Sequence, residues 1–150
     1  MSTGEISGPT GREQLEAIRD GHAPPAPIQR VLDFELVEVA DGRVAFRYTP
    51  SGEHRNPMGT VHGGVAMTLL DSAAGASLHS TLGAGEAYTT LETKVNLVRT
   101  IRAEGPVLRA EGSIIHRGAT TATAEAQLLD ESGRLYAHAT STCLILRSGG

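Results

Sequence analysis

The segment of residues 60–71, TVHGGVAMTLLD, contains the residues whose types and spacing could do chemistry. His62-Gly63-Gly64 stands at the start of a predicted helix, where backbone N–H groups lack helical partners and the helix end carries partial positive charge. Glycines let a ligand approach such a backbone closely, so this turn could stabilise the oxyanion of a polarised carbonyl. Two glycines could equally permit tight packing where a helix enters a sheet. On local sequence alone, packing is the preferred interpretation.

Asp71 is the more informative residue of this segment. It stands among apolar neighbours inside the predicted helix, although aspartate is a poor mid-helix residue and is rarely buried without a partner. A carboxylate held there could act as a general base. It could also simply hydrogen-bond Thr68, Ser72 or a hydroxyl of the sheet. The residue alone supports both interpretations equally.

Other candidate groups indicate less specialised roles. His62 could be a base, a hydrogen-bonding anchor or a structural histidine, and the helix N-terminus disfavours its protonated form, which favours the last two roles. The six histidines show neither HExxH nor Cys/His spacing, so no metal site is expected. Cys143 stands in an apolar, strand-like run and is interpreted as a buried, inert thiol. The chain has no GxSxG elbow and no P-loop.

The elements that must position these residues follow from hydrophobic patterning. Residues 62–85 carry apolar side chains almost all round a helical wheel, which predicts one buried helix. Alternating or β-branched runs predict strands before and after it. These runs span residues 31–39, 43–49, 87–101, 106–118, 119–130 and 134–146. Short turns join the last four, so the sheet should be antiparallel and should wrap around the helix.

The N-terminal region is predicted to contain a short helix of its own. Residues 1–9 are interpreted as a loose arm. Thr10 and Glu13 form a predicted capping box, and Gly21 stops the helix. The HAPPAP run of residues 22–27 is expected to be a stiff connector.

Composition limits the class of protein. The 150 residues fit one domain, and 39% hydrophobic with 20% charged residues indicates a folded globular chain. A net charge of −4 and an aromatic content of 3% argue against nucleic-acid binding. We find no secretory signal and no apolar stretch of roughly 20 residues, so no membrane association is expected. The single cysteine cannot form an internal disulfide, which favours a reducing, cytoplasmic compartment.

The run NPMGTVHGG of residues 56–64, followed by Asp71 in LLDSAAG, resembles the PaaI-like acyl-CoA thioesterases of the hotdog superfamily. The resemblance extends, in the order of elements, from about Phe34 to Leu146. It implies an α+β hotdog fold, in which an antiparallel sheet of five to six strands wraps one long central helix. The chain then divides into an N-terminal arm with a short helix (1–29), a hotdog thioesterase domain (30–147) and a tail (148–150).

Residue by residue, the resemblance implies a hydrolytic centre. Asp71 matches the family's catalytic carboxylate, as general base or nucleophile, and Gly63 matches the residue whose N–H polarises the thioester carbonyl. Asn56 and His62 match polar residues that help to position the substrate or the attacking water. Thr90 falls near a position that holds this water, although the adjacent residue, also a threonine, could take that role instead.

The CoA portion of the substrate would need a second group of residues. Gly64 stands beside the oxyanion donor, and Arg99 and Arg117 are cations near strand ends that could meet the phosphates, although a solvated surface charge is the simpler role for each. Gly118 could admit the pantetheine arm or serve as a hairpin glycine. Thr100 stands where the family often has proline, which changes a turn near the CoA channel. No cofactor is expected.

The proposed pair of groups has a geometric consequence. Gly63 and Asp71 are eight positions apart, which is about 12 Å along one helix. One helix cannot readily offer both groups to a single thioester carbon. A second copy of the helix, antiparallel across a two-fold axis, would bring Gly63 of one protomer to Asp71 of the other. We therefore expect an isologous homodimer, and a dimer of dimers beyond it.

Two other function classes stay open. A hotdog hydratase or dehydratase would need a histidine poised to remove a proton from carbon, and the offset of His62 from Asp71 fits this chemistry less well. A non-catalytic acyl-CoA-binding domain would bind the ester without turnover. Thiol release, enoyl-CoA hydration and calorimetry separate the three. The sequence does not identify the acyl group.

Overall fold

A computed structural model describes residues 7–148 of the chain. The expected loose arm (1–9) and tail (148–150) fall mostly outside this range, because residues 1–6 and 149–150 are not described. Within it, no helix is both long and apolar enough to cross a membrane.

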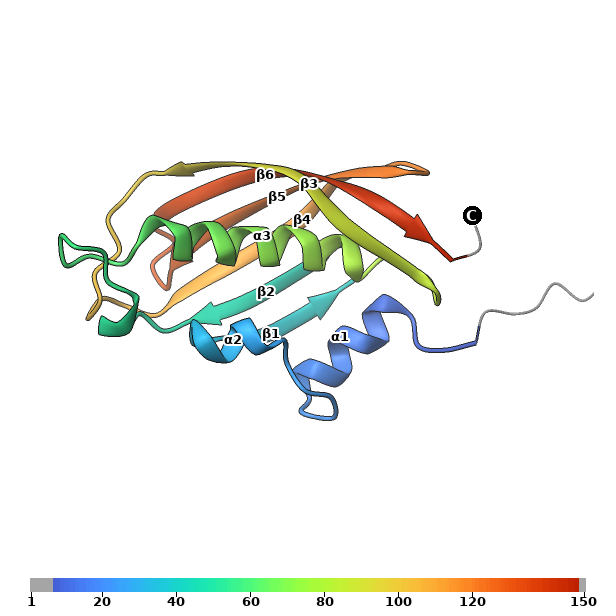
Figure 1. The fold of residues 1–150 in the computed structure, drawn as a ribbon, viewed down its shortest axis with the longest axis horizontal. Coiled ribbons are helices and arrows are strands. Elements are labelled where there is room, and N and C mark those ends of the chain that lie inside the picture. The colour runs from blue at the N-terminus through green and yellow to red at the C-terminus, as the bar shows by residue number, and fades with distance from the viewer. Residues whose placement is uncertain (1–6, 149–150) are drawn as a thin grey trace, which may run out of the picture.

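One antiparallel sheet forms the body of the molecule (Figure 1). Its six strands lie in the order β1-β2-β4-β5-β6-β3, and every neighbouring pair is antiparallel. Their bounds are β1 Phe34–Ala40, β2 Arg43–Tyr48, β3 Glu86–Leu97, β4 Leu108–Arg117, β5 Thr121–Asp130 and β6 Leu135–Arg147. This arrangement confirms the predicted α+β architecture. It also leaves β3, a strand of 12 residues, at one edge.

The central helix α3, Gly63–His79, lies across the inner face of the sheet (Figure 1). Leu69, Leu70 and Ala73 are fully buried between helix and strands. The helix lies so close to β4 that a Cβ added at Gly112 would be 2.0 Å from the carbonyl oxygen of Ala73. Only glycine therefore fits at this crossing.

The prediction that α3 is buried on every side was wrong for one stripe. Gly64, Thr68 and Asp71 are half-buried along this stripe, and Met67 is 46% exposed beside them. Strand β3 borders this stripe through its hydrogen bonds to Asp71, and the helix also packs on β2, β4, β5 and β6. Side chains of this stripe can therefore reach a ligand outside the sheet.

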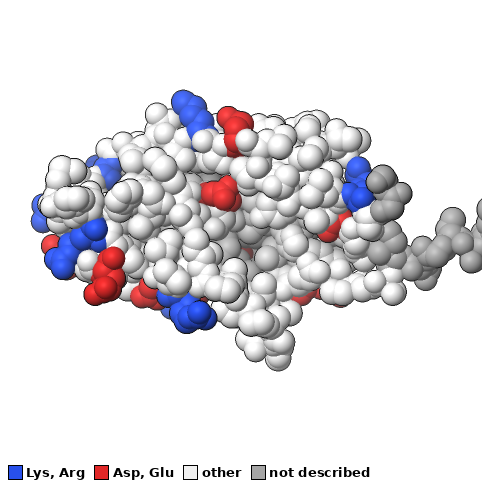
Figure 2. All heavy atoms as spheres, in the orientation of Figure 1, with Lys and Arg blue, Asp and Glu red and all other residues white. Residues whose placement is uncertain are grey.

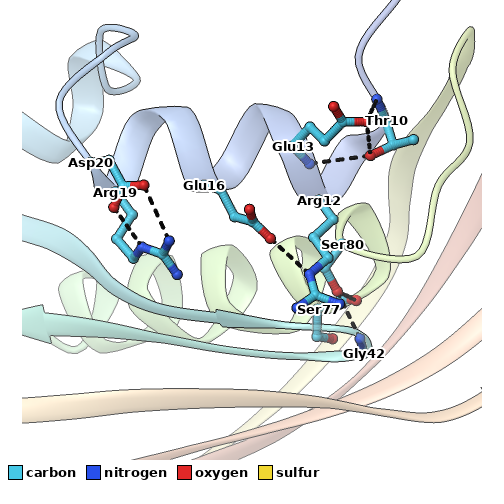
Figure 3. Close-up of polar contacts among 9 residues, drawn as sticks. All are labelled: Thr10, Arg12, Glu13, Glu16, Arg19, Asp20, Gly42, Ser77 and Ser80. Carbon is cyan, nitrogen blue, oxygen red and sulfur yellow. Dashed lines mark hydrogen bonds and ion pairs between the residues drawn. The ribbon is translucent and has the colours of Figure 1, made fainter.

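Helix α1, Gly11–Arg19, packs against β1 and the end of α3. Its predicted capping box is confirmed: Thr10 accepts from the Glu13 N–H, and the Glu13 carboxylate accepts from the Thr10 N–H (Figure 3). Leu15 points into the same core as Phe34. The helix is thus an integral part of the packed structure.

The ion pairs of α1 lie on its solvent side, where Arg12 pairs with Glu16 and Arg19 with Asp20 (Figure 3). Beyond the end of α3, Ser80 accepts a hydrogen bond of 2.8 Å from the Gly42 N–H. This bond links the β1–β2 turn to the helix.

A short helix α2, Pro27–Val31, stands where we expected a connector and the start of a strand. Proline is favoured at the first position of a helix, and the Gln29 side chain accepts from the Ala26 N–H to complete the turn. Asp33 then takes a positive φ of 51°, which ends the helix and lets β1 begin at Phe34. The expected boundary between residues 29 and 30 falls inside α2.

Candidate active site

Asp71 is held by two hydroxyl groups of the edge strand β3. The Thr90 hydroxyl donates to Asp71 Oδ1 at 3.0 Å, and the Thr93 hydroxyl donates to the same oxygen at 3.4 Å. Among residues 7–148, no group donates to Oδ2. One carboxylate oxygen is therefore oriented, while the other is free on the open stripe of α3.

Both threonines face the helix because β3 contains a bulge. The pairing with β6 runs from Thr90↔Cys143 directly to Glu92↔Thr142, so Leu91 is an extra residue in the strand. Side chains normally alternate between faces, and one extra residue shifts this alternation. Thr90 and Thr93 therefore point to the same side. Thr89, the alternative to Thr90, is exposed on the other face.

Sequence reasoning missed Thr93. Its hydroxyl lies 3.2 Å from that of Ser141, which is buried on β6 and donates to the Glu92 carbonyl oxygen at 3.1 Å. Thr93, one of the two residues that orient Asp71, is thus itself anchored to the next strand. A strict alternation along β3 would have turned Thr93 away, and nothing in the sequence marks the bulge.

The start of α3 presents one free N–H group. His62 caps the helix, and its Nδ1 accepts from the Gly64 N–H at 2.9 Å. This bond places the imidazole proton on Nε2, which fits the anchoring role expected of His62. The Gly63 N–H has no hydrogen-bond partner within residues 7–148. Of the two glycines, only Gly63 can offer its amide to a ligand.

Asn56 organises the loop that leads to this helix. Its Oδ1 accepts from the N–H groups of Met58, at 3.0 Å, and Thr60, at 3.2 Å. Its Nδ2 donates to the Thr60 hydroxyl at 3.0 Å. The side chain is therefore engaged within the loop, where it fixes the approach to Gly63 rather than projecting freely toward a substrate.

A pocket of about 260 Å³ lies beside the start of α3. Asn56, Gly63, Arg99 and Tyr136 are among its lining residues. The Arg99 guanidinium lies over the Tyr136 ring, 5.9 Å from its centroid. Of the residues expected at the site, this pocket brings together Asn56, Gly63 and Arg99.

Arg117 and Gly118 lie at the opposite end of α3. Arg117 donates to the Thr81 carbonyl oxygen at 2.5 Å and pairs with Glu86 at 3.1 Å. The Gly118 N–H donates to the Thr121 carbonyl oxygen at 2.8 Å in the β4–β5 turn, as expected of a hairpin glycine. Within one chain, the structure does not bring these two residues to Gly63.

The open stripe of α3 lies on a face of the molecule that carries few charged side chains (Figure 2). Figure 2 shows this face as largely uncharged, with an acidic group near its middle and most charged side chains toward its rim. Within residues 7–148, no group of three His, Cys, Asp or Glu side chains is arranged to hold a metal ion. The chemical groups of this face are a free carboxylate oxygen and a free backbone N–H.

Comparison with known proteins gives the family. Residues 58–137 match the model of the Thioesterase superfamily. A 1,4-dihydroxy-2-naphthoyl-CoA hydrolase of Listeria monocytogenes is 26% identical over 108 residues, covering 72% of this chain and 86% of that protein. A thioesterase family protein of Silicibacter pomeroyi is 27% identical with a TM-score of 0.77, covering 89% of this chain and 98% of that one.

The PaaI protein of Escherichia coli shares the fold. It superposes with a TM-score of 0.78 at 18% identity, over 94% of this chain and 98% of its own. The resemblance to PaaI-like proteins and the predicted hotdog fold are confirmed. The family model covers more than half of the sequence, including all of α3 and β3. The chain belongs to the Thioesterase superfamily.

Proposed function

We propose that the protein hydrolyses acyl-CoA thioesters, with Asp71 as the reacting carboxylate and the Gly63 N–H as the oxyanion donor. The observation that carries this proposal is the hydrogen bonding of the Asp71 carboxylate. The Thr90 and Thr93 hydroxyls donate to Oδ1, while Oδ2 is free on the open stripe. A carboxylate so oriented can accept a proton from water or attack a carbonyl carbon. The name of the Listeria relative, a hydrolase of an aryl-CoA, supports the same substrate class.

In the base mechanism, Asp71 takes a proton from water as the water oxygen attacks the thioester carbon. The Gly63 N–H stabilises the negative charge on the carbonyl oxygen, a contribution of about 3–4 kcal/mol per donor in other acyl-transfer enzymes. The C–S bond then breaks, and the CoA thiolate leaves and takes up a proton. In the nucleophilic alternative, Asp71 forms an anhydride that water hydrolyses.

The two groups can serve one carbon only if they come from different protomers. Along the molecule, β3 runs beside α3: a Cβ at Gly63 would lie 2.8 Å from Leu97, and Asp71 bonds Thr90 and Thr93. Suppose that β3 of one protomer pairs antiparallel with β3 of a second protomer about a two-fold axis near Lys94. Gly63, at the start of α3 in one protomer, would then lie near Asp71, in the middle of α3 in the other. The site would then be complete in a homodimer.

Two exposed leucines support this axis. Leu91 is 56% and Leu97 is 52% exposed, each three residues from Lys94. About an axis at Lys94, Leu91 of one protomer would meet Leu97 of the other. A long edge strand with exposed apolar side chains is a liability for a monomer, because its free N–H and C=O groups invite pairing.

The remaining candidates have supporting roles in this proposal. Arg99, in the pocket beside Gly63, is the cation proposed to meet the CoA phosphates. Arg117 already pairs with Glu86, so its charge is largely compensated. The bond from Gly64 to His62 Nδ1 leaves the imidazole without a free basic nitrogen, which disfavours proton abstraction by a hydratase.

The test is thiol release from a panel of short-chain, long-chain and aryl-CoA esters, without metal or nucleotide and with EDTA present. Enoyl-CoA hydration is measured on the same sample, and calorimetry records binding. We expect thiol release with at least one ester class. Hydration without thiol release, or binding without turnover across the panel, would contradict the proposal and identify the alternative class.

A further inference from the structure

His54 is a buried histidine that the proposed mechanism does not use. It is 8% exposed and ends a short 3₁₀ helix, Gly52–His54, after strand β2. The Tyr48 side chain beside it is 0% exposed, although tyrosine and histidine are ordinarily only partly buried. Burying a polar group costs free energy unless the group is hydrogen-bonded. The bonds that this pair makes therefore indicate what it holds in place.

The two ring nitrogens of His54 are bonded to two different elements. Nδ1 lies 2.8 Å from the Tyr48 hydroxyl, at the end of β2, and Nε2 lies 3.4 Å from the Val31 carbonyl oxygen, at the end of α2. A carbonyl oxygen can only accept, so Nε2 carries the proton and Nδ1 accepts from the tyrosine. Desolvation by burial, and secondly the charge of Asp33, raise the pKa of Tyr48 to about 12, so its hydroxyl is a donor at neutral pH. The imidazole is thus held in one orientation from both sides.

The backbone of His54 reaches the start of α3. Its carbonyl oxygen accepts from the His62 N–H at 2.8 Å, across the base of the loop that contains Asn56. His62 is the N-cap of α3, and its own carbonyl oxygen accepts from the Val65 N–H at 2.9 Å. The peptide that joins His62 to Gly63 is therefore fixed by His54 on one side and by the first turn of the helix on the other.

This peptide carries the proposed oxyanion donor. The N–H and C=O groups of a trans peptide share one plane and point in opposite directions. The Gly63 N–H therefore points away from the His62 carbonyl oxygen, which is directed into the helix at Val65. A rotation of this plane would displace the donor, and a displacement of about 1 Å in an active site can cost roughly 10²-fold in rate. The direction of the Gly63 N–H thus depends on what holds His62.

We propose that His54 is a positioning residue for the oxyanion donor. Its ring, held by Tyr48 and Val31, fixes its own carbonyl oxygen, which holds the His62 N–H. His62 in turn aims the Gly63 N–H at the substrate carbonyl. The inference rests on the proposed function, because it acts through Gly63. It gives a role to the end of β2 and to α2, which lie at the same end of the molecule as the start of α3 (Figure 1).

The competing account is that Tyr48 and His54 only stabilise the fold. Both accounts predict a lower Tm when the pair is broken, so a melting curve alone does not separate them. They differ in the kcat of the folded protein. They also differ in whether the loss of kcat depends on the presence of the Gly63 N–H.

The first test measures kcat and KM at a temperature where circular dichroism shows each variant to be folded. Tyr48→Phe removes one hydroxyl and should lower kcat about three- to tenfold, the value of one neutral hydrogen bond. His54→Leu removes both ring bonds and should lower kcat roughly 10- to 100-fold. KM should stay within about twofold in both variants, because the oxyanion contact is made in the transition state.

Two further variants calibrate this test. His54→Asn can place an acceptor near the position of Nδ1, where it would take the Tyr48 hydrogen bond, so it should recover part of the kcat lost in His54→Leu. Leu82→Ala is the control for stability, since Leu82 is 2% exposed in a separate apolar cluster. It should lower Tm while kcat of the folded protein stays at the wild-type value.

The second test is a double-mutant cycle with Gly63→Pro. Proline removes the donor that His54 is proposed to aim, so His54→Leu should lower kcat by less than about twofold more in that background. A residue that only stabilises the fold would cause the same fold-loss in both backgrounds. Thiol release over long incubations measures the residual rates. If the double variant does not fold, the same cycle with Tyr48→Phe decides the question.

The outcomes separate this inference from the proposed function. Thiol release from no ester by the wild type would overturn the proposed function, and this inference with it. Wild-type activity in Gly63→Pro would overturn the role of the Gly63 N–H, on which both depend. Equal fold-losses in the two backgrounds, or wild-type kcat in folded His54→Leu, would overturn only the positioning role of His54.

Discussion

Thr93 donates a hydrogen bond to the same oxygen of Asp71 as Thr90 does, although the two threonines are three residues apart on one strand. The bulge at Leu91 makes this possible by turning Thr93 toward the helix. Oδ2 stays free of hydrogen bonds from the described residues. This asymmetry between the two oxygens is the basis of the proposed chemistry.

Removing the two hydroxyls should therefore lower turnover. In Thr90→Val and Thr93→Val each side chain keeps its shape but loses its bond to a charged oxygen, which is worth about 1.5–3 kcal/mol. We expect the double variant to lose roughly 10- to 100-fold in kcat, with a smaller change in KM. Thr89→Val, on the outer face of the same strand, is the matched control. Equal kcat values for the double variant and Thr89→Val would show that these threonines do not position Asp71.

Asp71→Asn should retain the fold and lose most turnover. The amide has nearly the shape of the carboxylate and can still accept from Thr90, but it cannot take a proton from water. The expected loss is about 10²–10⁴-fold in kcat, typical of a missing general base. Stopped assays of thiol release, with a melting curve on the same sample, measure both properties. Turnover within a few-fold of wild type would make Asp71 a structural residue.

Gly112 should be essential for stability. A Cβ there would lie 2.0 Å from the oxygen and 2.3 Å from the carbonyl carbon of Ala73, and backbone atoms cannot simply rotate away. Gly112→Ala should cost about 2–3 kcal/mol and lower Tm by about 5–10 °C. Gly83→Ala is the control, since its Cβ would meet only Glu86 Oε1 at 3.4 Å. Equal melting temperatures for the two variants would contradict the close packing of α3 on β4.

Much of the fold was predictable from sequence, because its patterns are long and local. The apolar run around Asp71 required a central helix, and the six alternating or β-branched runs correspond to the six strands of the structure. The capping box of Thr10 and Glu13 was likewise visible as a spacing. In contrast, α2 depends on Pro27 and a Gln29 side-chain bond, and its five residues are too few to produce a helical period.

Less of the site was predictable, because its geometry depends on contacts between distant segments. The roles of Asp71 and Gly63 came from a motif and are still proposals. Thr93 was missed because a bulge reverses the alternation of β3.

The edge of β3 should be the dimer interface. Leu91→Asp would place a carboxylate opposite Leu97 of the partner, where it would lose water without gaining a cation. We expect a shift from dimer to monomer in sedimentation velocity and a parallel loss of thiol release. Ile115→Asp is the control, because Ile115 is 52% exposed on β4, which β5 and β6 separate from β3 in the sheet. A Leu91→Asp protein that remains dimeric would exclude this interface.

The Gly63 amide can be removed selectively. Gly63 is the first residue of α3, where proline is tolerated, and His62 already has the extended ψ of 134° that a following proline favours. Gly63→Pro should therefore fold and lose about 10²–10³-fold in kcat. Gly63→Ala is the matched control, since it adds a Cβ beside Leu97 but keeps the N–H.

The most direct measurement is activity in a heterodimer of one Asp71→Ala chain and one Gly63→Pro chain, purified through two different tags. Each homodimer should be nearly inactive. If every site takes Gly63 from one chain and Asp71 from the other, one of the two sites is intact, and about half of the wild-type activity per dimer should return. If each site draws both groups from one chain, every site carries one lesion. No recovery in verified, folded heterodimers would then contradict the shared site.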